Sequence, residues 1–216
     1  MIAKYYHLKR ISDLGIIAVI RAETFDDAMK IVEAVKNGGI NIIEITLTVP
    51  GALQVMEELK KTYQYDEVLL GAGTVLDAET ARLALLAGAE YVVSPTINVD
   101  VIKLCNRYQK LCIPGCMTPT EIIYAMESGA DVIKLFPGNV FSPSIIKAIT
   151  GPLPEANIIP TGGVSQDNAG QWIKNGSFAV GVGGDLTRGA SNGNYQLVTE
   201  TAKKYVEIIK KARHSD

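Results

Sequence analysis

Three ionisable side chains interrupt apolar runs of the sequence: Lys134 in DVIKLFP, Glu44 in NIIEITL and Arg21 at the end of GIIAVIR. Burying an ammonium or a carboxylate is costly unless the group is paired or neutral. A neutral buried lysine is a nucleophile that can form a Schiff base with a ketone, and a nearby carboxylate can move the protons this chemistry requires. Arginine suits a carboxylate or phosphate. The residues predict imine chemistry, with an inert interior Lys–Glu pair and a loop-holding arginine as alternatives.

Two glycine-rich turns, PTGGV at 160–164 and GVGGD at 181–185, supply a second kind of candidate site. Their unhindered backbone N–H groups can form an anion cradle with the helices that follow them. The candidate cradle residues are Gly162, Gly163, Gly183 and Gly184. One feature opposes this interpretation, because the carboxylate of Asp185 would repel a phosphate if it pointed into the cradle.

The composition excludes several function classes. Only His7 and His214 are histidines among 216 residues, so a Ser-His-Asp triad or a histidine zinc site in mid-chain is excluded. A formal net charge of −2 leaves no basic excess for a nucleic-acid partner. Cys105, Cys112 and Cys116 match neither a Cys-x-x-Cys pair nor a disulfide framework, which favours free thiols. No apolar run suits a signal peptide or a membrane span, so we expect a cytoplasmic protein without a membrane partner.

Eight short, β-branched apolar runs recur along the chain at intervals of about 20 to 27 residues. They lie at 15–21, 41–47, 67–73, 90–95, 110–116, 131–137, 157–163 and 178–184. Each interval has room for one strand, one helix and two short loops. Near-continuous apolar strands are typical of a parallel sheet that is buried on both faces.

Helix signals occupy the intervals between these runs. Glycine-containing triplets before the next strand predict helix ends at 37–39, 87–89, 128–130 and 175–177. Residues that favour helix starts are Thr24, Asp77, Asn98, Thr118, Ser142 and Ser165. An opening helix at about 4–14 and a closing helix at about 194–212 fall outside the repeat.

Eight such units predict an α/β protein, a single (β/α)8 TIM-barrel domain over residues 1–216 with an extra N-terminal helix. The competing fold is a doubly wound open sheet, which usually carries a G-x-G-x-x-G turn after its first strand, where this chain has RAETFDD. Reacting residues of a barrel project from the carboxyl ends of its strands. Strand alternation sends Lys134 and Phe136 to the interior, together with Glu44.

Seven motifs then appear in order over nearly the whole chain: IIEITLTVPGAL, GAGTVLD, VVSPT, PGCMTPTE, VIKLFPG, IIPTGGV and VGVGGDL. Together they closely resemble the bacterial 2-keto-3-deoxy-6-phosphogluconate / 4-hydroxy-2-oxoglutarate aldolases. The resemblance implies a class I aldolase that needs no metal or other cofactor and is usually a homotrimer of barrels. It places the Schiff-base lysine on Lys134, within KLFPG. The catalytic glutamate, which moves protons through a bound water, falls on Glu44 within EITL.

The resemblance also implies the substrate contacts. Thr74 of GAGT would contact the substrate carboxylate, and Pro95 and Phe136 would pack around the pyruvyl carbons. The phosphate contacts would fall on Gly162, Gly163, Gly183 and Gly184.

The chain departs from the family pattern at two places. Some members carry an arginine four positions beyond the glutamate, where this chain has Thr48. Galactonate-type relatives use an arginine on the first strand instead, which assigns the carboxylate clamp to Arg21. A phosphate-binding serine is common near the last glycine pair, where this chain has Gly184 and Asp185, so whether phosphate is required is an open question.

By this resemblance the chain cleaves 2-keto-3-deoxy-6-phosphogluconate to pyruvate and glyceraldehyde 3-phosphate. Cleavage of 4-hydroxy-2-oxoglutarate to pyruvate and glyoxylate is a second expected reaction. A 2-keto-3-deoxy-6-phosphogalactonate or unphosphorylated sugar-acid aldolase is the alternative. A phosphosugar isomerase would share the glycine cradle without needing an interior lysine, and a non-catalytic sugar-acid-binding barrel would bind without releasing pyruvate.

Overall fold

Strands and helices alternate along the chain in the computed structural model, which describes residues 3–214. Every predicted apolar run contains a strand, and the fifth is divided at Pro114 into two. The strands are β1 Ile16–Ile20, β2 Ile42–Thr46, β3 Leu69–Gly73, β4 Tyr91–Val93, β5 Leu111–Ile113, β6 Gly115–Cys116, β7 Ile133–Leu135, β8 Ile158–Pro160 and β9 Val180–Val182.

The helices lie in the intervals and at both ends of this series, as predicted. The α-helices are α1 Ala3–Leu14, α2 Phe25–Asn37, α3 Ala52–Thr62, α4 Ala78–Leu86, α5 Val99–Arg107, α6 Pro119–Glu127, α7 Ile145–Thr150, α8 Ala169–Lys174, α9 Gly184–Thr187 and α10 Tyr195–Arg213. Two short 3-10 helices are η1 Gly138–Val140 and η2 Arg188–Asn192.

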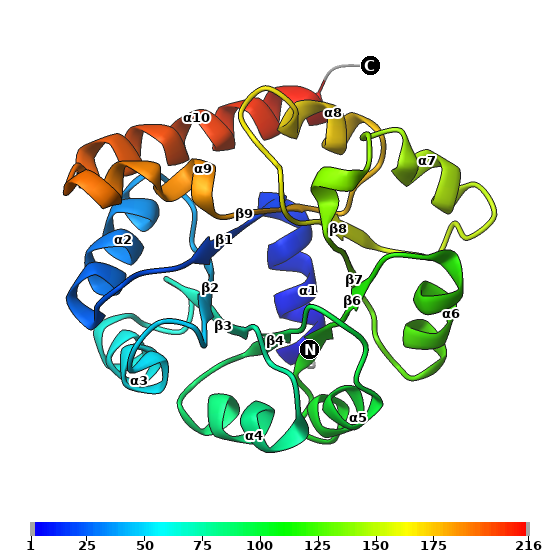
Figure 1. Cartoon of the computed structure of the whole chain (residues 1–216), viewed down its shortest axis with the longest axis horizontal. Helices are drawn as coiled ribbons and strands as arrows, with labels where there is room; N and C mark the ends of the chain where they lie inside the picture. The colour runs from blue at the N-terminus through cyan, green and yellow to red at the C-terminus, as the bar shows by residue number, and fades with distance from the viewer. Residues whose placement is uncertain (1–2, 215–216) are drawn as a thin grey trace.

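The strands form two parallel sheets that curl around a common centre, with most of the helices outside them (Figure 1). One sheet has the order β5-β4-β3-β2-β1-β9 and the other β6-β7-β8. A parallel bridge between Thr161, the residue after β8, and Gly181 in the middle of β9 joins the two sheets. The residues thus form an α/β fold, and the carboxyl ends of its parallel strands meet at one mouth.

Two hydrophobic layers lie on the two faces of the curled strands. The outer cluster, which packs strands against helices, includes Ile43, Ile45, Ile133 and Leu135. The interior cluster consists of Ile11, Ile17, Ile42, Leu69, Tyr91, Val93, Leu111, Ile113, Val132, Ile159 and Ala179. Because alternate strand residues fall into different clusters, Val132 points to the interior and its neighbour Ile133 points to the helices.

Most predicted helix caps are confirmed, and two are wrong. Thr24, Asp77, Asn98 and Thr118 are N-caps whose side chains accept hydrogen bonds from the first turn. Ser142 and Ser165 are not caps, because α7 starts after Ser144 and α8 after Asn168. Both serines begin turns that precede the helix instead. The predicted helix ends are followed by glycines with positive φ, namely Gly39, Gly88, Gly129 and Gly176.

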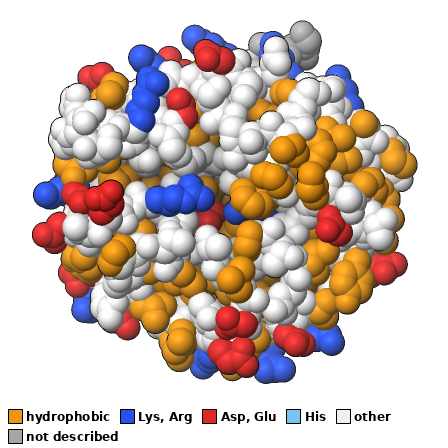
Figure 2. All heavy atoms as spheres, in the orientation of Figure 1, with side chains coloured by type: hydrophobic (Ala, Val, Ile, Leu, Met, Phe, Trp, Pro, Cys, Tyr) orange, Lys and Arg blue, Asp and Glu red, His pale blue; other side chains and the backbone are white. Residues whose placement is uncertain are grey.

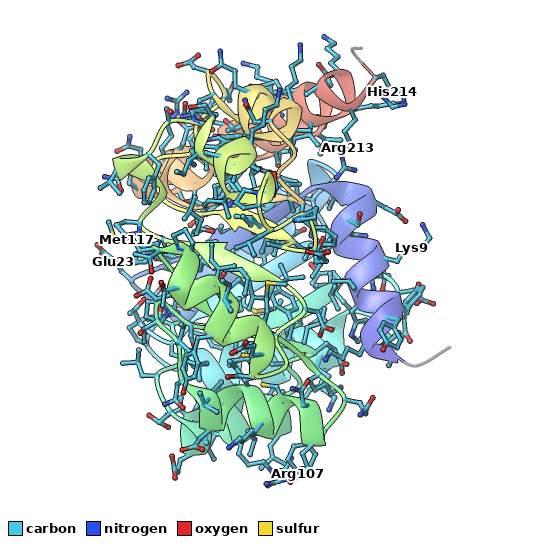
Figure 3. All side chains as sticks on the ribbon, turned by 90° about the vertical axis from the view of Figure 1, so that its right-hand side faces the viewer. Lys9, Glu23, Arg107, Met117, Arg213 and His214 are labelled. Atoms are coloured by element: carbon cyan, nitrogen blue, oxygen red, sulfur yellow. The ribbon has the colours of Figure 1, made fainter. Side chains whose placement is uncertain are left out.

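The end of the last helix contacts the end of the first helix on the side of the fold opposite the mouth. Arg213 near the end of α10 donates to the backbone carbonyls of Ser12 and Asp13 in α1 (Figure 3). On the other side of α1, Ile11 belongs to the interior cluster, so this helix covers the amino ends of the strands. Within residues 3–214, no helix combines the length and apolar character required to cross a bilayer.

Candidate active site

Lys134 and Glu44 occupy the middle of β7 and β2, and their side chains are 6% and 3% exposed. Strand alternation turns both inward, since their neighbours Ile133 and Ile45 belong to the outer cluster. The Lys134 Nζ lies 4.9 Å from the centre of the Phe136 ring. The salt bridges formed within residues 3–214 do not include Lys134, so the inert ion pair is absent from this part of the chain.

The charges of Lys134 and Arg21 act on the carboxyl group of Glu44. Burial raises the pKa of the Glu44 carboxyl, while the positive charges of Lys134 and Arg21 partly oppose that increase. A carboxyl with a raised pKa exchanges protons closer to neutral pH than an exposed glutamate does. The structure therefore brings together a buried amine and a buried carboxyl suited to proton transfer, with Arg21 exposed at the end of β1 above them.

The Glu44 carboxylate is held against the backbone of β3. A Cβ on Gly73 would overlap Oε1 of Glu44 and lie 2.5 Å from its Cδ. Gly73 pairs with Thr46 in the β2–β3 register, so this glycine is one layer closer to the mouth than Glu44. The strand thus leaves room for the carboxylate by having no side chain there.

We predict that Gly73→Ala lowers kcat/KM by about 100-fold, because the new methyl group forces the Glu44 carboxylate out of its place. Aldolase kinetics and thermal unfolding of the purified variant would measure the effect. Gly170→Ala is the matched control, since a Cβ there meets side chains only at 3.4 Å or more, on helix α8. Activity of Gly73→Ala equal to that of Gly170→Ala would contradict the assignment of this space to Glu44.

A cavity of about 370 Å³ opens at the mouth, between the carboxyl ends of β1, β7, β8 and β9, and Lys134 and Glu44 are not among the residues that line it. Six of the ten predicted site residues line it: Arg21, Phe136, Gly162, Gly163, Gly183 and Gly184. Gly162 and Gly163 have φ values of +92° and +72°, which glycine adopts readily. A Cβ on Gly183 would lie 2.9 Å from Nη1 of Arg21, so this turn approaches the guanidinium closely. The two glycine turns and Arg21 thus form one anion-suited surface.

Asp185 also lines the cavity, but its carboxylate is occupied by other partners. The hydroxyl of the buried Tyr205 in α10 donates to Oδ2 of Asp185 at 2.5 Å. Arg188 Nη1 lies 3.8 Å from Oδ1 of the same carboxylate. Burial and this hydrogen bond raise the pKa of Tyr205, which keeps its hydroxyl a donor. These contacts reduce the repulsion that the sequence indicated between Asp185 and an anion.

Thr74 and Pro95 are half-buried at the carboxyl ends of β3 and β4 and do not line the mouth cavity. A Cβ on Gly115 would overlap the carbonyl group of Pro95, so β6 approaches that turn closely. Two hydroxyl-bearing cavity residues were not predicted as site residues from the sequence, namely Thr161 and Ser165. Their position on either side of the glycine pair in PTGGVS was the signal that would have identified them.

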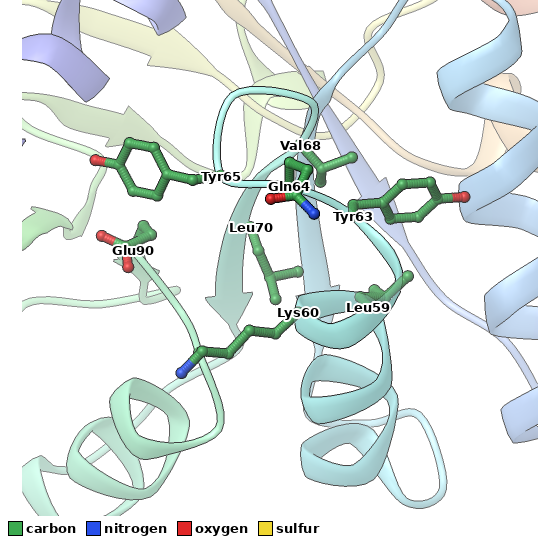
Figure 4. A pocket seen from close by; sticks show the side chains of 9 residues that line it. Leu59, Lys60, Tyr63, Gln64, Tyr65, Val68, Leu70 and Glu90 are labelled. Atoms are coloured by element: carbon green, nitrogen blue, oxygen red, sulfur yellow. The ribbon is translucent and has the colours of Figure 1, made fainter.

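Another cavity, of about 240 Å³, is lined by α3, the loop before β3 and the turn before β4 (Figure 4). It contains Lys60, Tyr65 and Glu90 but none of the predicted site residues. Glu90 already contacts Lys110, so this carboxylate is paired. The mouth cavity is therefore the better candidate for an active site.

Known proteins similar to this chain are aldolases. The chain is 36% identical over 203 residues to the 2-dehydro-3-deoxy-6-phosphogalactonate aldolase of Escherichia coli K12, covering 94% of this chain and 96% of the relative. It is 30% identical over 213 residues to the 2-dehydro-3-deoxy-phosphogluconate aldolase of Treponema pallidum, covering 97% of this chain and 99% of the relative.

Solved structures are similar over the same extent. A native KDPGal structure has a TM-score of 0.87 at 33% identity, covering 94% of this chain and 97% of the other. KDPG aldolase from Legionella pneumophila, with pyruvate captured as a covalent carbinolamine intermediate, has a TM-score of 0.82 at 28% identity and covers 89% and 94%. The family model described as KDPG and KHG aldolase matches residues 8–201. With that match and these relatives, the chain belongs to the KDPG and KHG aldolase family, whose members are carbon-carbon lyases.

Proposed function

We propose that this chain is a class I aldolase that cleaves 2-keto-3-deoxy-6-phosphogluconate to pyruvate and glyceraldehyde 3-phosphate, and 4-hydroxy-2-oxoglutarate to pyruvate and glyoxylate. The observation that carries the proposal is the buried, inward-facing pair Lys134 and Glu44, together with a mouth cavity lined by two glycine turns and by Phe136, whose ring centre lies 4.9 Å from the Lys134 Nζ. A buried amine that forms no ion pair with residues 3–214 suits nucleophilic attack, and the cavity suits the anionic end of a sugar acid.

In the proposed reaction, Nζ of Lys134 attacks the C2 ketone to form a carbinolamine, and uptake of a proton with loss of water gives a protonated imine. The C4 hydroxyl then loses its proton as the C3–C4 bond breaks, and the imine takes up the bonding electron pair as an enamine. The aldehyde leaves. Protonation of C3 and addition of water release pyruvate and the free amine. Glu44 moves protons in these steps through a water.

Substrate contacts follow from the same placement. We assign the substrate carboxylate to Arg21 and Thr74, and the pyruvyl carbons to Pro95 and Phe136. The phosphate contacts are assigned to Gly162, Gly163, Gly183 and Gly184. Arg21 lines the mouth cavity and lowers the pKa of Glu44, which supports its place near the reacting carbons.

A 2-keto-3-deoxy-6-phosphogalactonate aldolase is the second candidate. The observation that favours it is the arginine on the first strand together with Thr48 beyond the glutamate, where Thr48 is hydrogen-bonded to Thr46 at 2.8 Å. The 36% identity to the Escherichia coli phosphogalactonate enzyme agrees with this pattern. The two substrates differ in stereochemistry at the aldehyde half, so the same lysine and glutamate serve both.

A lactate-dehydrogenase-coupled assay for pyruvate tests the function across phosphogluconate-type, phosphogalactonate-type, unphosphorylated and hydroxyoxoglutarate substrates. We expect the highest kcat/KM with a phosphorylated substrate, because the glycine turns bind its phosphate. Proton exchange without pyruvate release would indicate an isomerase. A rise in melting temperature with no turnover of any substrate would indicate a binding protein, and either result would overturn the proposal.

Arg21→Gln is expected to raise KM by about 10- to 100-fold with a smaller change in kcat, because it removes a charge-assisted hydrogen bond to the substrate. Steady-state kinetics with the best substrate measure the changes in KM and in kcat separately. Arg82→Gln is the control, since Arg82 lies over the Tyr108 ring on the outer helices. An unchanged KM in Arg21→Gln would assign the carboxylate to another residue.

We extend the proposal to the assembly. A single barrel domain over residues 1–216 is supported by the β8–β9 bridge and the continuous interior cluster, although residues 1–2 and 215–216 lie outside the described part. A homotrimer is supported by exposed apolar side chains on one side of the molecule, where Figure 2 shows hydrophobic groups gathered near α6 and α7. They include Met117, Ile123, Tyr124 and Val140. Sedimentation at the mass of one 23.2 kDa chain would contradict the trimer.

The cellular location is proposed to be the cytoplasm. Cys105, Cys112 and Cys116 are free and buried, which suits a reducing compartment.

A further inference from the structure

Tyr91 carries a buried polar group that the proposed reaction does not use. Its side chain belongs to the interior cluster and is 0% exposed. The hydroxyl has no hydrogen-bond partner within residues 3–214. A buried hydroxyl without a partner is costly, and phenylalanine would fill the same space without that cost. The hydroxyl therefore requires an explanation that packing alone does not give.

The strand register places Tyr91 in the same layer as the catalytic carboxyl. Glu44 of β2 pairs with Gly71 of β3, and Gly71 pairs with Tyr91 of β4. A Cβ on Gly71 would overlap the Tyr91 ring, as a Cβ on Gly73 would overlap the Glu44 carboxylate. The inner face of β3 is thus bare at two successive inward positions. Glu44 leans over it from one side and Tyr91 from the other.

The two groups also interact electrostatically. Burial and the negative charge of Glu44 raise the pKa of Tyr91 well above its usual range, so the phenol stays neutral and its O–H remains a donor. The positive charges that act on Glu44 come from Lys134 on β7 and Arg21 after β1. Neither of these residues lies on β4, the strand that carries Tyr91.

We propose that Tyr91 is a positioning residue whose hydroxyl donates to the Glu44 carboxylate during turnover and holds it ionised in the orientation needed for proton transfer. Hydrogen bonds of catalytic groups often tighten only when substrate is bound, which accounts for the unpaired hydroxyl in this structure. The proposal rests on the proposed aldolase function. It concerns the proton-transfer steps and leaves the covalent bond at Lys134 unchanged.

Tyr91→Phe tests it, because phenylalanine keeps the ring over Gly71 and removes only the hydroxyl. Without the donated hydrogen bond, the ionised form of Glu44 is less stable and its pKa rises. On acidification, the variant should therefore lose activity at a higher pH than the unmodified enzyme does. We expect the acidic limb of the kcat profile to move up by about one pH unit. Tyr65→Phe is the control, since the Tyr65 hydroxyl contacts His7 at the other end of the fold.

The same substitution in a Glu44→Gln background shows whether the effect passes through Glu44. There, Tyr91→Phe should change kcat less than twofold at every pH. An unmoved acidic limb in the single variant would overturn the proposal, whether or not its melting temperature falls. An equal loss of kcat with and without Glu44 would also overturn it. Failure of the proposed function is separate, because in that case the unmodified enzyme would release no pyruvate from any of the four substrates.

Discussion

Replacing Lys134 with alanine is expected to lower kcat by at least about 10⁴-fold, because the covalent nucleophile is removed and no other lysine faces the interior from β7. The coupled pyruvate assay measures the loss. Lys134→Met provides a second variant that fills more of the buried space, so a packing defect is separated from a chemical one. Full activity in either variant would refute the assignment.

The covalent bond itself can be trapped. Borohydride reduction in the presence of pyruvate should leave a stable adduct on the peptide that contains Lys134, detected by mass spectrometry. Lys147→Ala is the matched control, since Lys147 is exposed on α7 and its loss should leave the adduct in place. An active enzyme that gives no adduct on Lys134 would exclude the Schiff-base mechanism.

Glu44→Gln is expected to lower kcat by about 10²- to 10⁴-fold while still permitting some trapped imine. The amide keeps the size of the side chain over Gly73, but it cannot take up or return a proton. Burial raises the pKa of Glu44, so Glu44 becomes protonated at a higher pH than an exposed glutamate does. On acidification, the unmodified enzyme should therefore begin to lose activity at that higher pH. That acidic limb should disappear in Glu44→Gln.

Comparison of the two readouts separates the roles of Lys134 and Glu44. A slow variant that still gives the reduced adduct has lost proton transfer. A variant that gives no adduct has lost the attack of the lysine amine on the ketone. Glu57→Gln on the exposed face of α3 is the control for a change of charge alone. Turnover in Glu44→Gln equal to that in Glu57→Gln would remove Glu44 from the mechanism.

The inward direction of the buried pair was predictable because it depends only on local alternation. In NIIEITL and DVIKLFP, the apolar residues beside Glu44 and Lys134 point to the helices, which leaves the charged residues inside. Four helix N-caps were predictable for the same reason, since a capping side chain binds the first turn of its own helix.

The features that the sequence did not indicate are those that depend on distant partners. The orientation of Asp185 is set by Tyr205, twenty residues later on α10. The role proposed for Tyr91 depends on its strand pairing with Gly71, and on the pairing of Gly71 with Glu44 on the next strand. Ser142 and Ser165 failed as caps because a second suitable residue, Ser144 or Asn168, follows within three positions and is used instead. Composition and periodicity do not distinguish such competitors.

Helix α1 and the interior cluster have a kinetic consequence. They cover the amino ends of the strands, so a ligand at Lys134 has the mouth as its exit within the described structure. In the proposed reaction, the three-carbon fragment is still bound to the lysine when the aldehyde leaves. We therefore expect ordered release, with the aldehyde leaving before pyruvate. In the synthetic direction, pyruvate must bind first. An aldehyde that binds before pyruvate would act as a competitive inhibitor with respect to pyruvate.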